Sequence, residues 1–155
     1  MADPIRIIPL GGLGEVGKNM MVVEYGDDIV VIDAGLMFPK EDMHGVDLVL
    51  PDTTYLLENR DRVRAVLITH GHEDHVGALP FLLRDLDVPV YAPPLAHDLV
   101  EVKLKEHIGV GSYDLNEVQP GDSIEFGGIT AEFFRVCHSI PDACGIALHT
   151  EAGVV

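Results

Sequence analysis

The sequence predicts one α/β domain in which antiparallel and mixed strands share a core. Short β-rich runs joined by tight turns occur near both ends of the chain, and apolar strands alternate with short helices in the middle. The chain has 155 residues, of which 47% are hydrophobic. That is enough for one packed domain and too little for two.

The glycine-rich segment PLGGLGEVGKNM (9–20) follows an apolar run at residues 5–10 that we expect to form the first strand. Its spacing imitates a dinucleotide fingerprint, with Asp33 about twenty positions later, and also a phosphate-binding loop. Both motifs need a helix after the glycines, because the N–H groups of its first turn hold the phosphate. Residues 20–25 (MMVVEY) are β-rich instead. We therefore interpret the glycines as a loop between strands and reject nucleotide binding.

The strands expected at residues 20–25 and 29–35 are separated by about three residues, so they form a hairpin, since a parallel connection needs roughly a dozen. Residues 36–52 contain Pro and Gly and are expected to form a long loop. A helix capped by Asp52 or Thr53 should follow, ahead of a buried strand at residues 63–69.

The second half of the chain continues the alternation, without an internal repeat or a linker. In order, the sequence predicts a short helix at 75–86, a strand at 88–93, an amphipathic helix at 94–108 with Pro near its start, a hairpin at 122–136 that turns at Gly127-Gly128, and a last strand at 145–150.

Charge and composition narrow the function. The chain carries 26 acidic and 10 basic residues, which gives a formal charge of −16. This charge disfavours electrostatic binding of nucleic acid, which normally needs a basic surface, and it favours binding of a cation. No apolar run approaches the ~20 residues that span a bilayer, and the N-terminus lacks the pattern of a secretory signal. Cys137 and Cys144 are too few for a disulfide framework, and both are expected in the core. A reduced, cytoplasmic setting is expected.

The stretch LITHGHEDHVGALP carries the strongest functional signal. His70, His72, Asp74 and His75 lie within six residues, where a buried strand gives way to a helix. His70 and His72 project the same way from an extended segment and can reach one ion. Asp74 and His75 point elsewhere, which suits a second ion beside the first. A polar surface turn is the alternative, but imidazole and carboxylate are ordinary zinc donors, and their density favours a metal site.

Two further residues extend the predicted site. His138, at the end of a later strand, is assigned as the third histidine of the first ion, with water in the fourth position. Asp33 ends a buried apolar strand, where a carboxylate without partners is costly. We expect it to hydrogen-bond a ligand histidine or nearby backbone; the alternative is a strand-end turn residue. His44, in the long loop, is a further candidate for the cleft.

The motif His-x-His-x-Asp-His, with Asp33 before it and His138 after it, resembles the metallo-β-lactamase fold, an αββα sandwich. The phrases PLGGLGEVGKNM, THGHEDHVGALP and HSIPD closely resemble the ribonuclease J family, metal-dependent RNases of the β-CASP branch. The resemblance implies that residues 1–155 are the N-terminal part of a metallo-β-lactamase domain, the first half of the sandwich, with β-CASP and C-terminal domains further along. The strand pattern runs to Val155 without a polar tail, which favours a longer chain.

The resemblance also implies roles for the site residues. Two Zn²⁺ ions are expected, with Mn²⁺ or Mg²⁺ as alternatives. His70, His72 and His138 would hold one ion, while Asp74 and His75 would contribute to the second. Asp74 would also orient the attacking water or take its proton. The other ligands, the general acid and a 5′-phosphate pocket are expected outside these residues, so the fragment alone is expected to be inactive.

The implied function is hydrolysis of RNA phosphodiester bonds in RNA processing and decay. It combines 5′-to-3′ exonuclease action on 5′-monophosphate RNA with endonuclease cleavage, in a full-length homodimer or homotetramer. Two alternatives remain open. One is a metallo-hydrolase of the same fold that acts on a thioester or lactam, since a fold alone does not choose the chemistry. The other is a metal-binding domain without catalysis.

Overall fold

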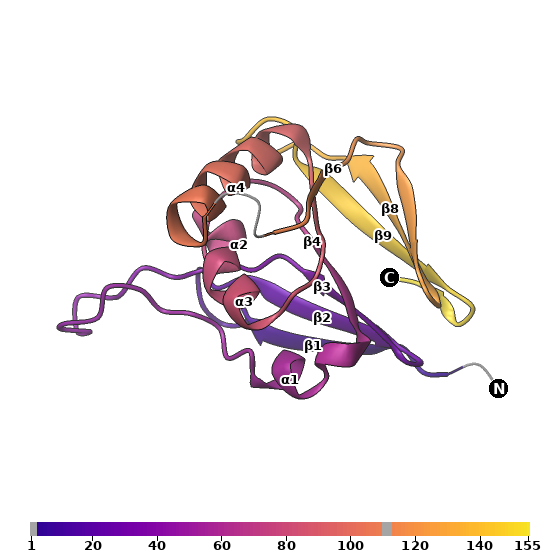
Figure 1. Ribbon diagram of the computed structural model, residues 1–155, viewed down its shortest axis with the longest axis horizontal. Helices are drawn as coiled ribbons and strands as arrows, with labels where there is room; N and C mark the ends of the chain where they lie inside the picture. The colour runs from indigo at the N-terminus through magenta and orange to yellow at the C-terminus, as the bar shows by residue number, and fades with distance from the viewer. Residues whose placement is uncertain (1–2, 110–112) are drawn as a thin grey trace.

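Two β-sheets pack face to face in the structure, a computed structural model that describes residues 3–109 and 113–155, and helices cover the outer face of the larger sheet (Figure 1). The larger sheet has six strands in chain order: β1 (Arg6–Gly11), β2 (Met20–Tyr25), β3 (Asp28–Ile32), β4 (Val63–Leu67), β5 (Val90–Ala92) and β6 (Leu115–Glu117). The smaller sheet has the order β10-β9-β8-β7, with β7 (Ser123–Phe126), β8 (Ile129–Arg135), β9 (Cys144–Thr150) and β10 (Gly153–Val154).

The pairing of the strands confirms the predicted α/β class with mixed strands. The β1–β2 and β2–β3 pairs are antiparallel, whereas β3–β4, β4–β5 and β5–β6 are parallel. All pairs in the smaller sheet are antiparallel. The helices are α1 (Thr54–Glu58), α2 (Glu73–Val76), α3 (Leu79–Asp85) and α4 (Pro94–His107), with a 3-10 turn at Arg60–Arg62. None of the helices in the described ranges is long and apolar enough to cross a membrane.

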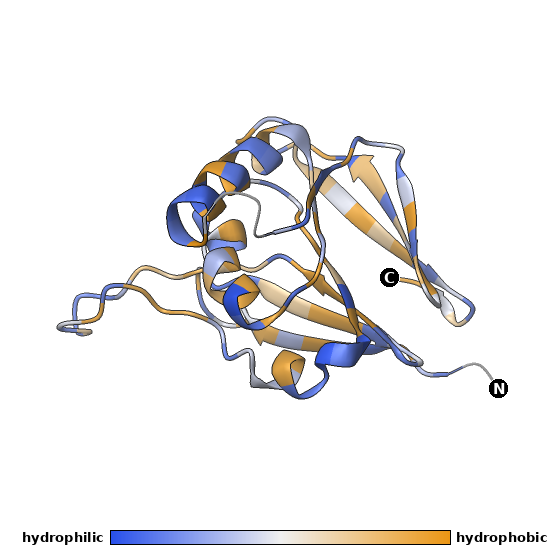
Figure 2. Ribbon diagram, in the orientation of Figure 1, coloured by the Kyte–Doolittle hydropathy of each residue, from blue (hydrophilic) through white to orange (hydrophobic). Residues whose placement is uncertain are grey.

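Both faces of the central strands are buried along most of their length, which explains why residues 29–32 in β3 and 65–67 in β4 are apolar at every position rather than at alternate ones. In β3, Ile29 and Val31 pack with the helix residues Leu56 and Leu79. Val30, between them, faces the smaller sheet. The strands are correspondingly hydrophobic over much of their length in Figure 2, while α4 shows both hydrophilic and hydrophobic residues, and its Leu99 and Val102 are exposed. Each fully buried aliphatic side chain of this kind contributes about 1.5–3 kcal/mol to folding.

The prediction of one helix at residues 75–86 was wrong, because two short helices, α2 and α3, occupy that region. The carbonyl oxygens of Glu73, Asp74 and His75 also accept backbone hydrogen bonds from the segments at residues 19 and 34–36. The N–H of Ala78 bonds to Ala34 O at 2.8 Å instead of continuing the helix. Pro80 has no N–H and sits in the first turn of α3, a position that starts a new helix.

Three other differences concern strand ends and edges. The strand predicted at residues 29–35 stops at Ile32, because Asp33 adopts the left-handed backbone conformation, with φ of 61°. Cys137 is exposed rather than in the core, since β8 ends at Arg135 and the chain leaves the sheet; Cys144 is buried as predicted. The strands β6 and β10 were not predicted, and with three and two residues they are too short to show a period.

The buried carboxylate of Glu24 stabilises the end of the β1–β2 pair that lies opposite the glycine-rich loop, where Glu24 pairs with Arg6. Glu24, only 6% exposed, accepts hydrogen bonds from Arg62 at 2.6 Å, from Arg6 at 3.2 Å and from the Tyr55 hydroxyl. Burial raises the pKa of Glu24, but the hydrogen bonds from Tyr55 and Arg62 outweigh it, so the pKa lies below its usual value. The ionised form is therefore the one that stabilises the fold.

Replacing Glu24 with glutamine should lower the free energy of unfolding by about 1–3 kcal/mol at neutral pH, because two arginines lose their buried counter-charge. The contribution of the carboxylate is fully present above the pKa of an unfolded glutamate, about 4.3, and is lost as the pH falls through the lower folded pKa. Urea unfolding measured at a series of pH values should show the difference shrinking in acid. Glu125→Gln, at an exposed position, should change stability by less than about 0.5 kcal/mol.

Candidate metal centre

The predicted site residues come together at one end of the two sheets. Asp33 follows β3, the segment from His70 to His75 follows β4, and His138 follows β8 by three residues. Because β3 and β4 are parallel, their carboxyl ends meet at the same edge. Residues far apart in the chain are thereby placed around one point.

Three histidines converge at that edge. His70 Nε2 lies 3.0 Å from His72 Nδ1 and 3.1 Å from His138 Nε2. One ring nitrogen from each of the three lies within 4.8 Å of the others. His70 is buried while His138 is exposed, so the group opens to solvent on the His138 side. Three imidazole nitrogens this close together can hold one divalent cation and leave its fourth position open, so the cluster is compatible with metal binding.

The proton on His70 is held on the side away from this point. The hydroxyl of Thr69 lies 2.8 Å from Asp33 Oδ2, and since the carboxylate can only accept, the hydroxyl donates to it. The same hydroxyl lies 2.9 Å from His70 Nδ1, from which it accepts a hydrogen bond, leaving Nε2 free for a metal. Burial, together with the charges of His75, His138 and His72, lowers the pKa of His70 to about 4. His70 is therefore neutral at physiological pH, as a metal ligand must be.

Asp33 also holds His75, as the sequence led us to expect. Its Oδ2 lies 2.6 Å from His75 Nδ1, which leaves Nε2 facing Asp74 Oδ2 at 3.5 Å. Burial lowers the pKa of His75, but the hydrogen bond and charge of Asp33 outweigh it, so the pKa is raised. Asp74 and His75 thus form a separate pair of donors beside the histidine group. The roles of these residues as metal ligands stay a prediction.

Asn19 is a residue of this site that the sequence analysis missed. Its Nδ2 donates to Asp74 Oδ2 at 2.9 Å and lies 3.2 Å from His75 Nε2. The only sequence signal for it is its place at the end of the glycine-rich loop. His44, in contrast, is exposed on the loop between β3 and α1, which extends away from the sheets (Figure 1), and lies outside the histidine group.

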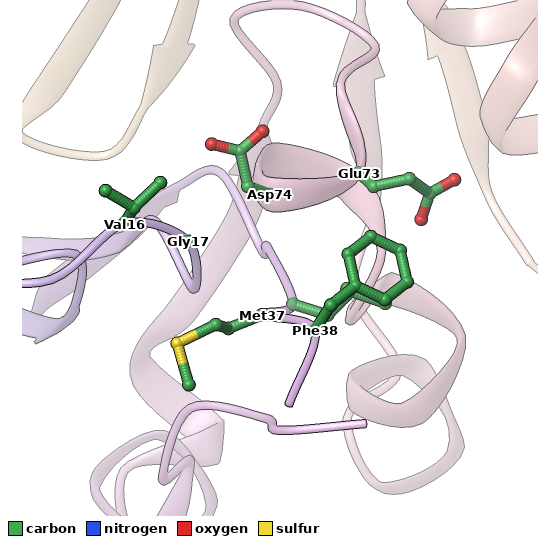
Figure 3. Close-up of a pocket in the computed structure, with 7 residues that line it drawn as sticks. Val16, Gly17, Met37, Phe38, Glu73 and Asp74 are labelled. Atoms are coloured by element: carbon green, nitrogen blue, oxygen red, sulfur yellow. The ribbon is translucent and has the colours of Figure 1, made fainter. Parts of the chain in front are cut away.

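A pocket of about 420 Å³ adjoins Asp74 (Figure 3). Val16 and Phe38 are 89% and 63% exposed at this pocket, and the rest of its lining is Gly17, Leu36, Met37, Glu73 and Asp74. Figure 3 shows the carboxylates of Asp74 and Glu73 pointing away from each other. Glu73 pairs instead with Lys103 on α4 at 2.8 Å. Of the two carboxylates, Asp74 is the one available to the metal centre.

A mixed sheet packed on an antiparallel sheet, with histidines and aspartates gathered at the strand ends, defines a metal-binding domain of the metallo-β-lactamase type. The chain belongs to the metallo-beta-lactamase superfamily, whose family model matches residues 13–149.

Curated relatives carry a more particular name. The chain is 47% identical over 153 residues to Ribonuclease J of Synechocystis sp., covering 97% of this chain and 24% of that protein. It is 44% identical over 153 residues to Ribonuclease J 1 of Streptococcus pyogenes serotype M3, covering 99% of this chain and 27% of that protein. The chain thus spans about a quarter of the length of these relatives.

A solved structure shares the fold. Rm3 metallo-beta-lactamase superposes with a TM-score of 0.61 over 96% of this chain and 58% of that chain. Its sequence identity is 21%, so this likeness shows the fold alone.

Replacing Asp33 with asparagine should weaken divalent-metal binding by about 10–100-fold, because both His70 and His75 lose the group that fixes their proton positions. Asparagine tolerates the left-handed backbone of this position, so the fold is spared. Competition titration of Zn²⁺ against a chelator measures the change. Asp142→Asn is the matched control, since Asp142 has the same φ of 61° and, within the described residues, bonds none of the site histidines. Equal affinities in the two variants would contradict the assignment.

Proposed function

We propose that this chain is the metal-centre portion of a metal-dependent ribonuclease that hydrolyses RNA phosphodiester bonds. The observation that carries the proposal is the pairing of a histidine triad with a neighbouring Asp74–His75 pair, both tied to Asp33. Identities of 44% and 47% to proteins named Ribonuclease J, over nearly the whole chain, favour RNA over other substrates.

Zn²⁺ is the ion we propose for both positions, since imidazole and carboxylate donors suit it, with Mn²⁺ or Mg²⁺ as alternatives. His70, His72 and His138 would hold one ion, and Asp74 with His75 would contribute to the second. Two such ions, when bound, supply hydroxide near neutral pH and offset charge on the phosphoryl oxygens.

The chain's own groups then have distinct tasks. Asp33 keeps the proton of His75 on Nδ1 through a direct hydrogen bond. It keeps the proton of His70 on Nδ1 through the hydroxyl of Thr69. In both residues the Nε2 lone pair is left for the centre. Asp74 Oδ2 is engaged by Asn19, which leaves Oδ1 to orient the attacking water or take its proton. The pocket beside Asp74, lined by Val16, Met37 and Phe38, offers an apolar surface for an uncharged part of the substrate.

The rest of the proposal concerns the complete protein. The charge of −16 leaves these 155 residues poorly suited to grip an RNA backbone. We therefore assign the binding of the RNA backbone, the general acid and the remaining metal ligands to residues of the complete protein outside these 155. The activity we propose combines 5′-to-3′ exonuclease action on 5′-monophosphate RNA with endonuclease cleavage, in cytoplasmic RNA processing and decay, by a homodimer or homotetramer.

The test is a time course of the full-length gene product on a 3′-labelled RNA that carries a 5′-monophosphate. Shortening from the 5′ end or internal cuts are expected in the wild type. His72→Ala should slow them by more than about 100-fold, beyond the effect typical of changes outside the ligand shell. His107→Ala, an exposed histidine on α4, is the matched control and should leave the rate unchanged. Intact RNA in the presence of zinc, manganese and magnesium would overturn the ribonuclease and point to a thioester or lactam substrate.

A further inference from the structure

The glycine-rich loop between β1 and β2 is followed by a strand and not by the helix that a phosphate-binding loop needs, and it places Asn19 beside Asp74 and His75. The loop carries Asn19 into the metal centre through backbone turns that need glycine. Gly17 has φ of 104°, and a Cβ there would lie 2.9 Å from Met37 Cβ. A Cβ on Gly12 would lie 2.7 Å from Asn19 Oδ1. Side chains at these positions would therefore push the loop, and Asn19 with it, away from the site.

The backbone of Asn19 is fixed on both sides. Its N–H donates to Asp74 O at 2.9 Å, and its carbonyl accepts from the Gly35 N–H at 3.0 Å. Gly35 must be glycine for this contact, since a Cβ there would overlap the Asp74 carbonyl. The segment that follows Asp33 and the turn that holds Asp74 are thus joined through one residue.

The side chain of Asn19 reaches the Asp74–His75 pair and not the histidine triad. Its Nδ2 donates to Asp74 Oδ2 at 2.9 Å and to Asp74 O at 3.1 Å, and it lies 3.2 Å from His75 Nε2. The Asp74 side chain is 40% exposed, so without this amide its carboxylate is free to rotate into solvent. Holding a ligand in one rotamer before the ion arrives removes part of the entropy cost of binding.

We propose that Asn19 is a positioning residue for the second metal ion, which orients the carboxylate of Asp74 and the turn that carries His75. The inference rests on the proposed two-ion function. It assigns to the glycine-rich motif the role of delivering an amide donor to one ion position and not to the other.

The experiment is a Zn²⁺ titration of the full-length gene product by calorimetry, with bound metal counted after dialysis. The wild type should take up two ions. In Asn19→Ala the second ion should bind about 10–100-fold more weakly, as is typical when a group that orients a ligand is removed, while the affinity of the first ion is unchanged. Asn19→Leu, which keeps the shape of the side chain without its amide, should show the same selective loss.

The control is Asn59→Ala, since the amide of Asn59 bonds the Tyr55 carbonyl at the end of α1, outside the site. It should leave both affinities unchanged. Equal weakening of both ions in both Asn19 variants would reveal a merely structural role and overturn the inference, as would unchanged affinities. A wild-type protein that takes up only one ion would overturn the two-ion function itself, which is a different failure.

Discussion

The buried carboxylate of Asp33 is the constraint on which the rest of the site depends. A charged group that is only 5% exposed is tolerated only when each of its oxygens has partners. Here the partners are the N–H and hydroxyl of Thr69 and the ring of His75. Satisfying one buried charge therefore also sets the proton positions of two histidines in two neighbouring donor groups. The left-handed backbone of Asp33, with φ of 61°, directs its carboxylate to both.

The second constraint is a competition for backbone carbonyls around α2. In an uninterrupted helix these groups would bond only to N–H groups four residues on. Instead Asp74 O accepts from Asn19, His75 O from Ala34, and Glu73 O from both Leu36 and Gly77. These hydrogen bonds interrupt the helix, and they hold Asp74 and His75 at the end of the sheet. The metal centre and the irregular backbone are consequences of the same hydrogen bonds.

Fold and chemistry make separate contributions to the functional conclusion. Rm3 metallo-beta-lactamase shares the architecture at 21% identity, so the architecture does not select a substrate. The donor set is compatible with a divalent cation, because one nitrogen from each of three imidazoles lies within 4.8 Å of the others and one of these residues, His70, is buried and neutral. The proposal that the substrate is RNA rests on the relatives named Ribonuclease J, which match nearly all of this chain.

The sequence by itself determined the strand order of the hairpins, the class of the fold and most of the candidate site. Those features are local, since His70, His72, Asp74 and His75 lie within six residues and a buried strand shows its apolar run directly. Only the tertiary structure decided the split of the helix at residues 75–86, the exposure of Cys137 and the place of Asn19. Each of these depends on hydrogen bonds or packing between segments far apart in the chain. The pattern of apolar residues indicates which side of a strand or helix is buried, but not which distant segment it contacts.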